Sequence, residues 1–343
     1  MKELRFAIVG AGAIARAYEA AFREVKGATV VAVCDTNGAA AEELASRIGC
    51  DAYSLLPALL RKSSFDAAIV CTPPVTHESI SCKILQSGRH VLCEKPLSIT
   101  VNSARRMLAV AEHCGMILTM ASKFRYAADV RRAREILFAG EIGDLVFAEN
   151  AFTSFVDMSR RWNSDSTVSG GGVLIDNGTH AVDILRYLLG NLRDIQVVEG
   201  RRMQGLAVED TVRLFVHNDE GVMGAADLSW SINKELETFL RIYGSAGTIL
   251  VGWKESRFRR QGEDAWNTFG KGYDKIQAFA DQIGNFCGAI RGEARLLVTQ
   301  RDALASVQAV QAAYAALECA RWERIGSQLE ELTPLRAGAL AAS

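Results

Sequence analysis

The sequence predicts an α/β protein of two domains, in which a doubly wound parallel sheet is followed by a second α/β domain with an antiparallel sheet. The chain has 343 residues, and a single hydrophobic core rarely grows beyond ~250–300 residues. Over the first third, short apolar runs alternate with amphipathic segments, as in proteins built from βαβ units. Beyond residue 122 the apolar runs lengthen and follow one another through tight turns, which is typical of antiparallel strands.

The first domain is predicted over residues 1–122. Short apolar runs predict its strands, at residues 5–9, 29–34, 67–71, 90–93 and 116–120. Apolar side chains at three- and four-residue spacings predict the intervening helices, at residues 13–25, 39–48, 75–86 and 100–113. Strands that are joined by helices in this way run parallel in one sheet.

The second domain is predicted over residues 123–343, and only the change of pattern places this boundary. Extended runs predict its strands, at residues 145–155, 195–199, 211–217, 222–231, 238–243 and 248–251. Helical periodicity predicts one helix before them and two after them, at residues 129–138, 274–290 and 301–321. The helices near the end, between about residues 274 and 325, are assigned to this second domain.

Composition argues against several classes of partner. The 39 Lys and Arg residues nearly balance the 40 Asp and Glu residues, so no net field would hold a nucleic acid or an anionic membrane. No apolar run approaches the ~18 residues of a membrane span, and the first residues lead into a strand rather than a secretory signal. The eight cysteines form no C-x-x-C pair, and several lie in apolar runs, as reduced thiols do. We therefore expect a cytoplasmic protein with no nucleic-acid or membrane partner.

A glycine-rich turn, Gly10-Ala11-Gly12-Ala13-Ile14-Ala15, lies between the first predicted strand and the first predicted helix. Gly10 permits the tight turn, and Gly12 lets backbone N–H groups approach a pyrophosphate at the helix N-terminus, formed by Ala13 and Ile14. The alternative is a simple strand-to-helix turn. Asp35 favours a dinucleotide, because it ends the second strand where an acidic residue would bind the ribose hydroxyls. No arginine follows it to receive a 2′-phosphate, so we predict NAD rather than NADP.

Two further turns follow later strands of the same predicted sheet. One is Thr72-Pro73-Pro74-Val75-Thr76-His77, and the other is Glu94-Lys95-Pro96. Ligands of such sheets collect beyond the carboxyl ends of the strands. Taken singly, each turn is also explained as a rigid proline turn, with Lys95 solvated.

Together with the segment Gly170-Gly171-Gly172-Val173-Leu174-Ile175-Asp176-Asn177-Gly178-Thr179-His180-Ala181-Val182-Asp183, these turns resemble the family of glucose-fructose oxidoreductase, inositol dehydrogenase and related sugar dehydrogenases (Gfo/Idh/MocA). The resemblance implies a Rossmann domain followed by an α/β domain, whose large open antiparallel sheet commonly builds homodimers or homotetramers. It implies that Lys95, Asp176 and His180 are catalytic and bind substrate. Within the two turns, the residues assigned to the cofactor are Thr72, Pro73, His77, Glu94 and also Lys95.

The sequence departs from the family pattern at two places. Thr72 stands where many members have Asn, which leaves the cofactor assignment unchanged. Lys123-Phe124-Arg125-Tyr126 replaces a pattern that often contains Asn or Arg-Arg. Because this segment borders the substrate in the family, substrate identity is left open, and Arg125 is a candidate substrate contact.

Asp176, His180 and Asp183 are spaced so that one helix face would carry all three. Oxidation of an alcohol needs a base for the hydroxyl proton, and His180 is the natural candidate because its unperturbed pKa is near neutrality. Asp176 would orient the imidazole or bind a hydroxyl, while Lys95 would stabilise negative charge on the reacting oxygen. The alternatives are an ion-paired surface histidine, a zinc site and a helix cap at Asp176. No third strong ligand accompanies this segment, so we expect no metal.

The segment Asp157-Met158-Ser159-Arg160-Arg161-Trp162-Asn163 precedes the glycine cluster. The face of Trp162 beside Arg and Asn side chains suits a sugar ring, although a packing or interface tryptophan is an equal alternative. Asp183 and Arg125 complete the predicted substrate contacts.

The predicted function is an NAD-dependent dehydrogenase of a sugar, amino sugar or cyclitol. An NAD-using epimerase or glycosidase, or a non-catalytic NAD-binding relative, is the alternative.

Overall fold

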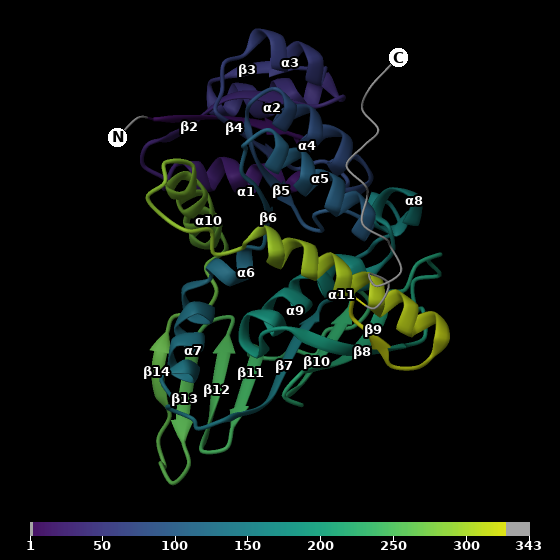
Figure 1. Ribbon diagram of the computed structural model, residues 1–343. Helices are drawn as coiled ribbons and strands as arrows, with labels where there is room; N and C mark the ends of the chain where they lie inside the picture. Colours follow the sequence, from purple (N-terminus) through teal and green to yellow (C-terminus); the bar gives the residue numbers. More distant parts are fainter. Residues whose placement is uncertain (1–2, 327–343) are drawn as a thin grey trace.

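The computed structural model describes residues 3–326, which form two domains that lie one above the other in Figure 1. The upper domain in that view holds a six-stranded sheet in the order β3-β2-β1-β4-β5-β6, in which every pair of neighbours is parallel. The strands are β1 (Leu4–Val9), β2 (Ala28–Cys34), β3 (Asp51–Tyr53), β4 (Ala67–Val70), β5 (His90–Glu94) and β6 (Leu118–Ala121). The helices are α1 (Ala13–Phe22), α2 (Gly38–Ile48), α3 (Leu56–Lys62), η1 (Pro74–Thr76), α4 (His77–Gln86) and α5 (Val101–His113). The predicted doubly wound sheet is confirmed.

Burial on both faces explains why the central strands are continuous apolar runs. All four residues of β4 are buried, and so are the last four residues of β1. The strand order reverses beside β1, because the chain continues to β2 on one side and later returns to β4 on the other. Ligands of doubly wound sheets bind at such a reversal, beyond the carboxyl ends of the strands.

The second domain is built on a nine-stranded sheet in the order β14-β13-β12-β11-β7-β10-β9-β8-β15. Its strands are β7 (Leu145–Thr153), β8 (Leu192–Glu199), β9 (Thr211–Asn218), β10 (Met223–Ser229), β11 (Thr238–Gly244), β12 (Gly247–Gly252), β13 (Ser256–Arg260), β14 (Asn267–Gly270) and β15 (Glu323–Arg324). This sheet is the large sheet predicted for the second domain. It is mixed and not antiparallel throughout, because β10 runs parallel to β7. No hairpin joins these two strands, because a long helix and two further strands separate them in the chain.

Helices cover one face of the nine-stranded sheet. The helices of this half of the chain are α6 (Lys123–Tyr126), α7 (Ala128–Phe138), η2 (Trp162–Ser164), α8 (Ser166–Ser169), α9 (Val173–Leu189), α10 (Lys275–Ile290) and α11 (Gln300–Cys319). α9 packs on β7 and β10, and α11 packs on β8 (Figure 1). Side chains such as Leu185, Leu214 and Ile242 are fully buried in the core between them.

The last two helices tie the domains together. Phe286 and Phe279 of α10 lie 6.2 Å and 4.7 Å, between ring centroids, from Phe6 and Tyr18 of the first domain. α10 therefore packs with the first core, which amends its assignment to the second domain. α11 contributes Val307 to the first domain's core and Ala313 to the second domain's core. The division between the two domains at residue 122 stays a prediction.

Two further features of the described residues bear on earlier expectations. All eight cysteines are free thiols. In the part of the chain that the structure describes, no helix combines the length and apolar character needed to cross a membrane.

Candidate functional site

The glycine turn after β1 has the shape that a dinucleotide requires. Gly10 has φ +99°, and a Cβ there would meet the backbone carbon of Cys71 at 2.7 Å, so only glycine fits. Gly12 precedes α1, and nothing lies within 4 Å of where its Cβ would be. This open space in front of the helix N-terminus fits a pyrophosphate, because the first N–H groups of a helix point at such an anion.

Asp35, directly after β2, is held by the same turn. Its Oδ2 accepts a hydrogen bond from the N–H of Ala11 at 2.6 Å, and its Oδ1 accepts one from the N–H of Asn37 at 2.8 Å. Each carboxylate oxygen keeps a further lone pair for a ribose hydroxyl. The carboxylate thus lies beside the glycine turn, which is the position that the predicted ribose contact needs.

His77 is fully buried, and both of its ring nitrogens are engaged. Nε2 bonds with the carbonyl oxygen of Thr72 at 2.8 Å and Nδ1 with that of Pro96 at 2.9 Å. Burial lowers the pKa of the ring, although an imidazole that bonds two carbonyls must donate from both nitrogens to satisfy both. His77 therefore joins the two predicted cofactor turns. It is buried and does not line the cavity between the domains, which corrects its assignment as a cofactor-binding residue.

Glu94 ends β5, and its carboxylate is hydrogen-bonded to Tyr18 of α1. Its carboxylate accepts a hydrogen bond from Tyr18 Oη at 2.7 Å and one from the N–H of Lys95 at 3.1 Å. Gln282 of α10 donates to the same Tyr18 oxygen at 3.1 Å. Burial raises the pKa of Glu94, and it also raises the pKa of Tyr18 well above its usual value. This network fixes the direction in which Lys95 leaves the sheet.

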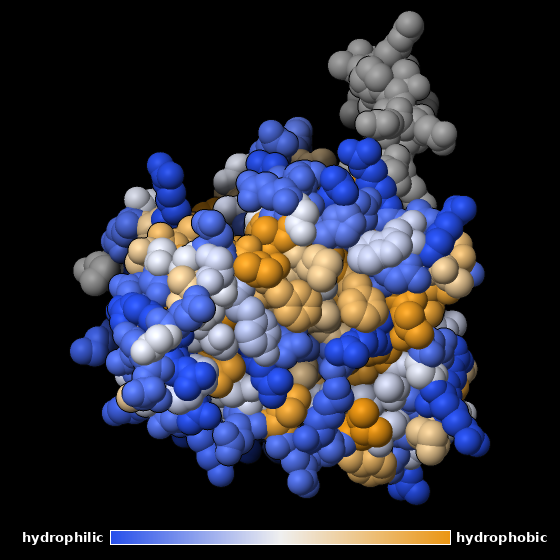
Figure 2. Space-filling model, turned by 90° about the horizontal axis from the view of Figure 1, so that it is seen from below, coloured by the Kyte–Doolittle hydropathy of each residue, from blue (hydrophilic) through white to orange (hydrophobic). Residues whose placement is uncertain are grey.

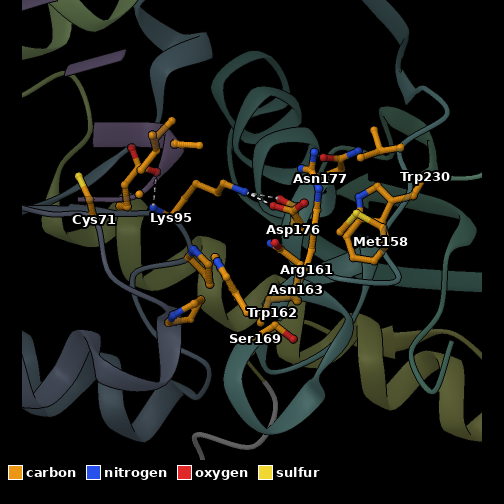
Figure 3. Close-up of a pocket in the computed structure, with 18 of the residues that line it drawn as sticks. Cys71, Lys95, Met158, Arg161, Trp162, Asn163, Ser169, Asp176, Asn177 and Trp230 are labelled. Atoms are coloured by element: carbon orange, nitrogen blue, oxygen red, sulfur yellow. Dashed lines mark hydrogen bonds and ion pairs between the residues drawn. The ribbon is translucent and has the colours of Figure 1, made fainter. Parts of the chain in front are cut away.

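A cavity of about 570 Å³ opens beyond these strand ends, between the two domains (Figure 3). The first domain lines it with the glycine turn and with Thr72 and Lys95, and the second domain lines it with Asp176 and Trp162. Pro73 does not line the cavity, whereas its neighbour Pro74 does. The volume is within the range typical of small-molecule sites.

Lys95 spans this cavity and forms an ion pair with Asp176, as Figure 3 shows. Its Nζ also donates to the main-chain oxygen of Asp176 at 3.2 Å. Asp176 lies in the first turn of α9, whose N-cap residue is Gly172, so the alternative of a capping role for Asp176 is not what the structure shows. The N–H groups of Gly172 and Leu174 are satisfied by the carboxylate of Glu209, at 2.9 Å and 3.1 Å. Because Glu209 caps the helix, the Asp176 carboxylate is available to Lys95.

His180 follows one turn later on α9 but is withdrawn from the cavity. It is 7% exposed, and its ring meets the edge of Phe124 at a centroid distance of 5.1 Å. Its Nδ1 is buried and has no hydrogen-bond partner among residues 3–326. Burial, followed by the positive charges of Lys95 and Lys123, holds the pKa of His180 well below its usual value. The imidazole is therefore neutral at neutral pH.

Asp183 and Arg125 are joined to one another instead of lining the cavity. Arg125 Nε lies 2.8 Å from Asp183 Oδ2, and both residues are buried. Asp302 of α11 lies 3.3 Å from the same guanidinium. Because their charged groups are occupied inside the protein, both predicted substrate contacts are corrected: they are residues that hold α6, α9 and α11 together.

The structure adds pocket residues that the sequence did not reveal. Lys275 begins α10, while Trp230 follows β10, and both line the cavity. Both residues lie far along the chain from the sequence motifs, so no local pattern marked them as part of the site. Among the described residues, no group of three His, Cys, Asp or Glu side chains is arranged to hold a metal ion.

Two stretches of the chain match known family descriptions. Residues 4–122 match the oxidoreductase family with an NAD-binding Rossmann fold, and residues 130–250 match the GFO/IDH/MocA C-terminal domain. The chain belongs to the GFO/IDH/MocA family. The resemblance seen in the motifs is confirmed, and this member of the family is an oxidoreductase whose first domain binds NAD.

Several known proteins are similar to this GFO/IDH/MocA chain. The rhizopine catabolism protein MocA of Rhizobium meliloti is 27% identical over 317 residues, which are 91% of this chain and 95% of that protein. The scyllo-inositol 2-dehydrogenase (NAD(+)) of Bacillus subtilis is 24% identical over 324 residues, 89% of this chain and 92% of that protein. The crystal structure of GenD2 from gentamicin A biosynthesis in complex with NAD has a TM-score of 0.84 and 26% identity, and the match covers 94% of this chain and 97% of that one.

Proposed function

We propose that this oxidoreductase is an NAD-dependent dehydrogenase that oxidises a secondary ring hydroxyl of a sugar, amino sugar or cyclitol. The observation that carries the proposal is the Lys95 ammonium, which is paired with Asp176 inside the cavity beside the NAD-binding turn. The similarity to an inositol dehydrogenase and to other enzymes named for sugars supports this class of substrate. Trp162 and Asn163 on the cavity wall offer an apolar face and a polar edge, as a sugar ring requires.

The glycine turn and Asp35 would hold NAD, which would supply the acceptor for the hydride of the carbinol carbon. The hydroxyl proton would leave to a base. Lys95 would donate a hydrogen bond to the reacting oxygen and stabilise the negative charge that develops on it. Asp176 would orient the ammonium and accept a hydrogen bond from a neighbouring hydroxyl. His180, neutral at neutral pH, is the proposed final acceptor of the proton. Because its ring does not line the cavity, the proton would have to reach it by way of Asp176, which lies one turn earlier on α9 and does line the cavity. The products are the ketone, NADH and one proton.

The test is a screen of hexoses, amino sugars and inositols for NADH formation by the purified protein. Net NADH from one of these alcohols supports the dehydrogenase. Epimerisation or bond cleavage without net NADH would instead show that oxidation is transient. NAD binding with no reaction of any alcohol would contradict the proposed catalysis.

We also propose that the protein forms a homo-oligomer through the uncovered face of its nine-stranded sheet. The strand register places Phe147 beside Tyr243 and Met223 on this face, with the two aromatic rings 6.1 Å apart between centroids. Figure 2 shows apolar side chains gathered on the face of the molecule seen from below, which the second domain forms. An apolar patch of this kind is typical of an interface.

Light scattering coupled to gel filtration tests the oligomer: a dimer or tetramer is expected. Replacing Tyr243 by Glu should shift the mass toward a monomer, because it places a charge in the interface. A wild-type monomer at micromolar concentration would contradict the proposal.

The free thiols also support the proposed cytoplasmic location, which cell fractionation would check.

A further inference from the structure

The charged side chains that line the cavity differ in whether they have a partner within the protein. Lys95 is neutralised by Asp176. Glu94, the other acid of the lining, is turned toward Tyr18, and burial raises its pKa. Three cations of the lining remain: Arg160, Arg161 and Lys275.

Within residues 3–326, neither Arg160 nor Arg161 has a side-chain hydrogen bond or an ion pair with another residue. Both lie in the exposed segment between β7 and η2, and both face the cavity. The nearest acid in the chain, Asp157, accepts a hydrogen bond from the N–H of Ser159 at 2.9 Å. The charges of both arginines help to lower its pKa, but neither guanidinium forms a hydrogen bond or an ion pair with it. Adjacent arginines that face a cavity without a hydrogen-bonded ion-pair partner form an anion-binding surface.

We expect the anionic part of NAD to lie at the opposite wall of the cavity. Its pyrophosphate belongs at the N-terminus of α1, on the wall that the first domain contributes, and its nicotinamide ring carries a positive charge. Arg160 and Arg161 line the second domain's wall of the cavity. Figure 3 shows Arg161 close to Trp162 and to Asp176, where the reacting part of a substrate would lie. We therefore expect the NAD-loaded protein to keep a positive surface in the substrate half of the cavity.

We propose that the substrate is an anionic sugar, a sugar carboxylate or a sugar phosphate, whose negative group is bound by Arg160 and Arg161. The inference rests on the proposed dehydrogenase function and narrows its substrate class. A guanidinium donates two parallel hydrogen bonds to a carboxylate or a phosphate, which a neutral hydroxyl cannot accept in the same way. Trp162 would cover the apolar face of the ring while the arginines bind its charged end, so the pair also decides which hydroxyl reaches Lys95.

The experiment compares glucose and myo-inositol with glucuronate and glucose 6-phosphate, in kinetics with NAD and in calorimetric titration of the NAD-loaded protein. We expect at least one of the two anionic sugars to have the higher kcat/KM and the tighter binding. Replacing either arginine by Gln should raise the KM for that sugar about 10- to 100-fold, because each removes a charged hydrogen-bond pair. The KM for a neutral sugar and the affinity for NAD should be unchanged. Whichever anionic sugar is preferred shows whether the charged group is a carboxylate or a phosphate.

Arg201→Gln is the matched control, because Arg201 is exposed and does not line the cavity. Arginine-dependent binding of an anionic sugar without NADH formation would support the anionic site and contradict the dehydrogenase. NADH formed from a neutral sugar at least as efficiently as from both anionic sugars would overturn the inference and leave the dehydrogenase standing. Failure of both anionic sugars to bind, or binding that survives loss of both arginines, would also overturn it.

Discussion

Replacement of His180 by Gln separates a catalytic histidine from a packing one. If His180 takes the hydroxyl proton, the variant should lose roughly 10²–10⁴-fold in the single-turnover rate of NADH formation, the usual contribution of a general base. Because the pKa of the buried ring is held well below its usual value, wild-type activity should stay level through neutral pH. Its acidic limb should lie below pH 6.5, the usual histidine value. Stopped-flow absorbance against pH measures both quantities.

The same lowered pKa predicts how the free energy of unfolding changes with pH. Below pH ~6.5 the unfolded chain binds a proton at this ring and the folded chain does not, so stability falls as pH falls toward the folded pKa. Each pH unit in that window costs about 1.4 kcal/mol. Lowered pKa values of His77 and His90 add to the wild-type slope, so urea unfolding of wild type and His180→Gln should differ only by the share of His180.

His113→Gln is the matched control, because this ring is exposed and does not line the cavity, and it should leave the single-turnover rate unchanged. A His180→Gln protein with the wild-type single-turnover rate and an unchanged acidic limb would refute the role of base. Proton removal would then have to be assigned to Lys95 or Asp176, which line the cavity.

Three further predictions follow from contacts in the structure. Lys95→Ala should lower turnover by about 10²–10³-fold with little change in the Kd for NAD measured by fluorescence, and unchanged turnover would remove Lys95 from the mechanism. Asp35→Ala should narrow the preference for NAD over NADP in kcat/KM, because the carboxylate would repel a 2′-phosphate; tighter binding of NADP by wild type would show that its role is wrong. Asp183→Asn should cost about 3 kcal/mol in the free energy of unfolding by urea, because it leaves the buried Arg125 without its nearer partner; wild-type stability of the variant would contradict the structural role.

The sequence predicted best those features that are encoded locally. Alternation of apolar runs and helical segments predicted the order of most elements, because each run is buried by its own strand or helix. The strand β3 was missed because its three residues are not buried and carry no apolar run. The glycine turn and the Glu94-Lys95-Pro96 turn were found because a ligand-binding turn requires particular residues at fixed spacing.

Features that depend on pairing between distant segments were not predictable from these patterns. Asp183 shares a helix face with Asp176, so spacing alone assigned both to the substrate, whereas Arg125 from α6 draws Asp183 into the interior. His77 was placed at the correct turn, but the carbonyl of Pro96 that engages it comes from another strand end. Periodicity identified α10 without indicating which core it would cover. Only the fold shows that Lys275 at its start reaches the cavity.

The packing of α10 also sets an order of events during synthesis. The first domain's sheet and its helix α1 are translated early, but the rings of Phe279 and Phe286, which pack on Tyr18 and Phe6, emerge only near the end of the chain. Until then the nascent first domain exposes an apolar flank that its own segment cannot bury, and such surfaces invite aggregation. A fragment comprising residues 1–122 should accordingly bind chaperones or precipitate. The ribosome must deliver most of the polypeptide before the nucleotide-binding half reaches its native packing.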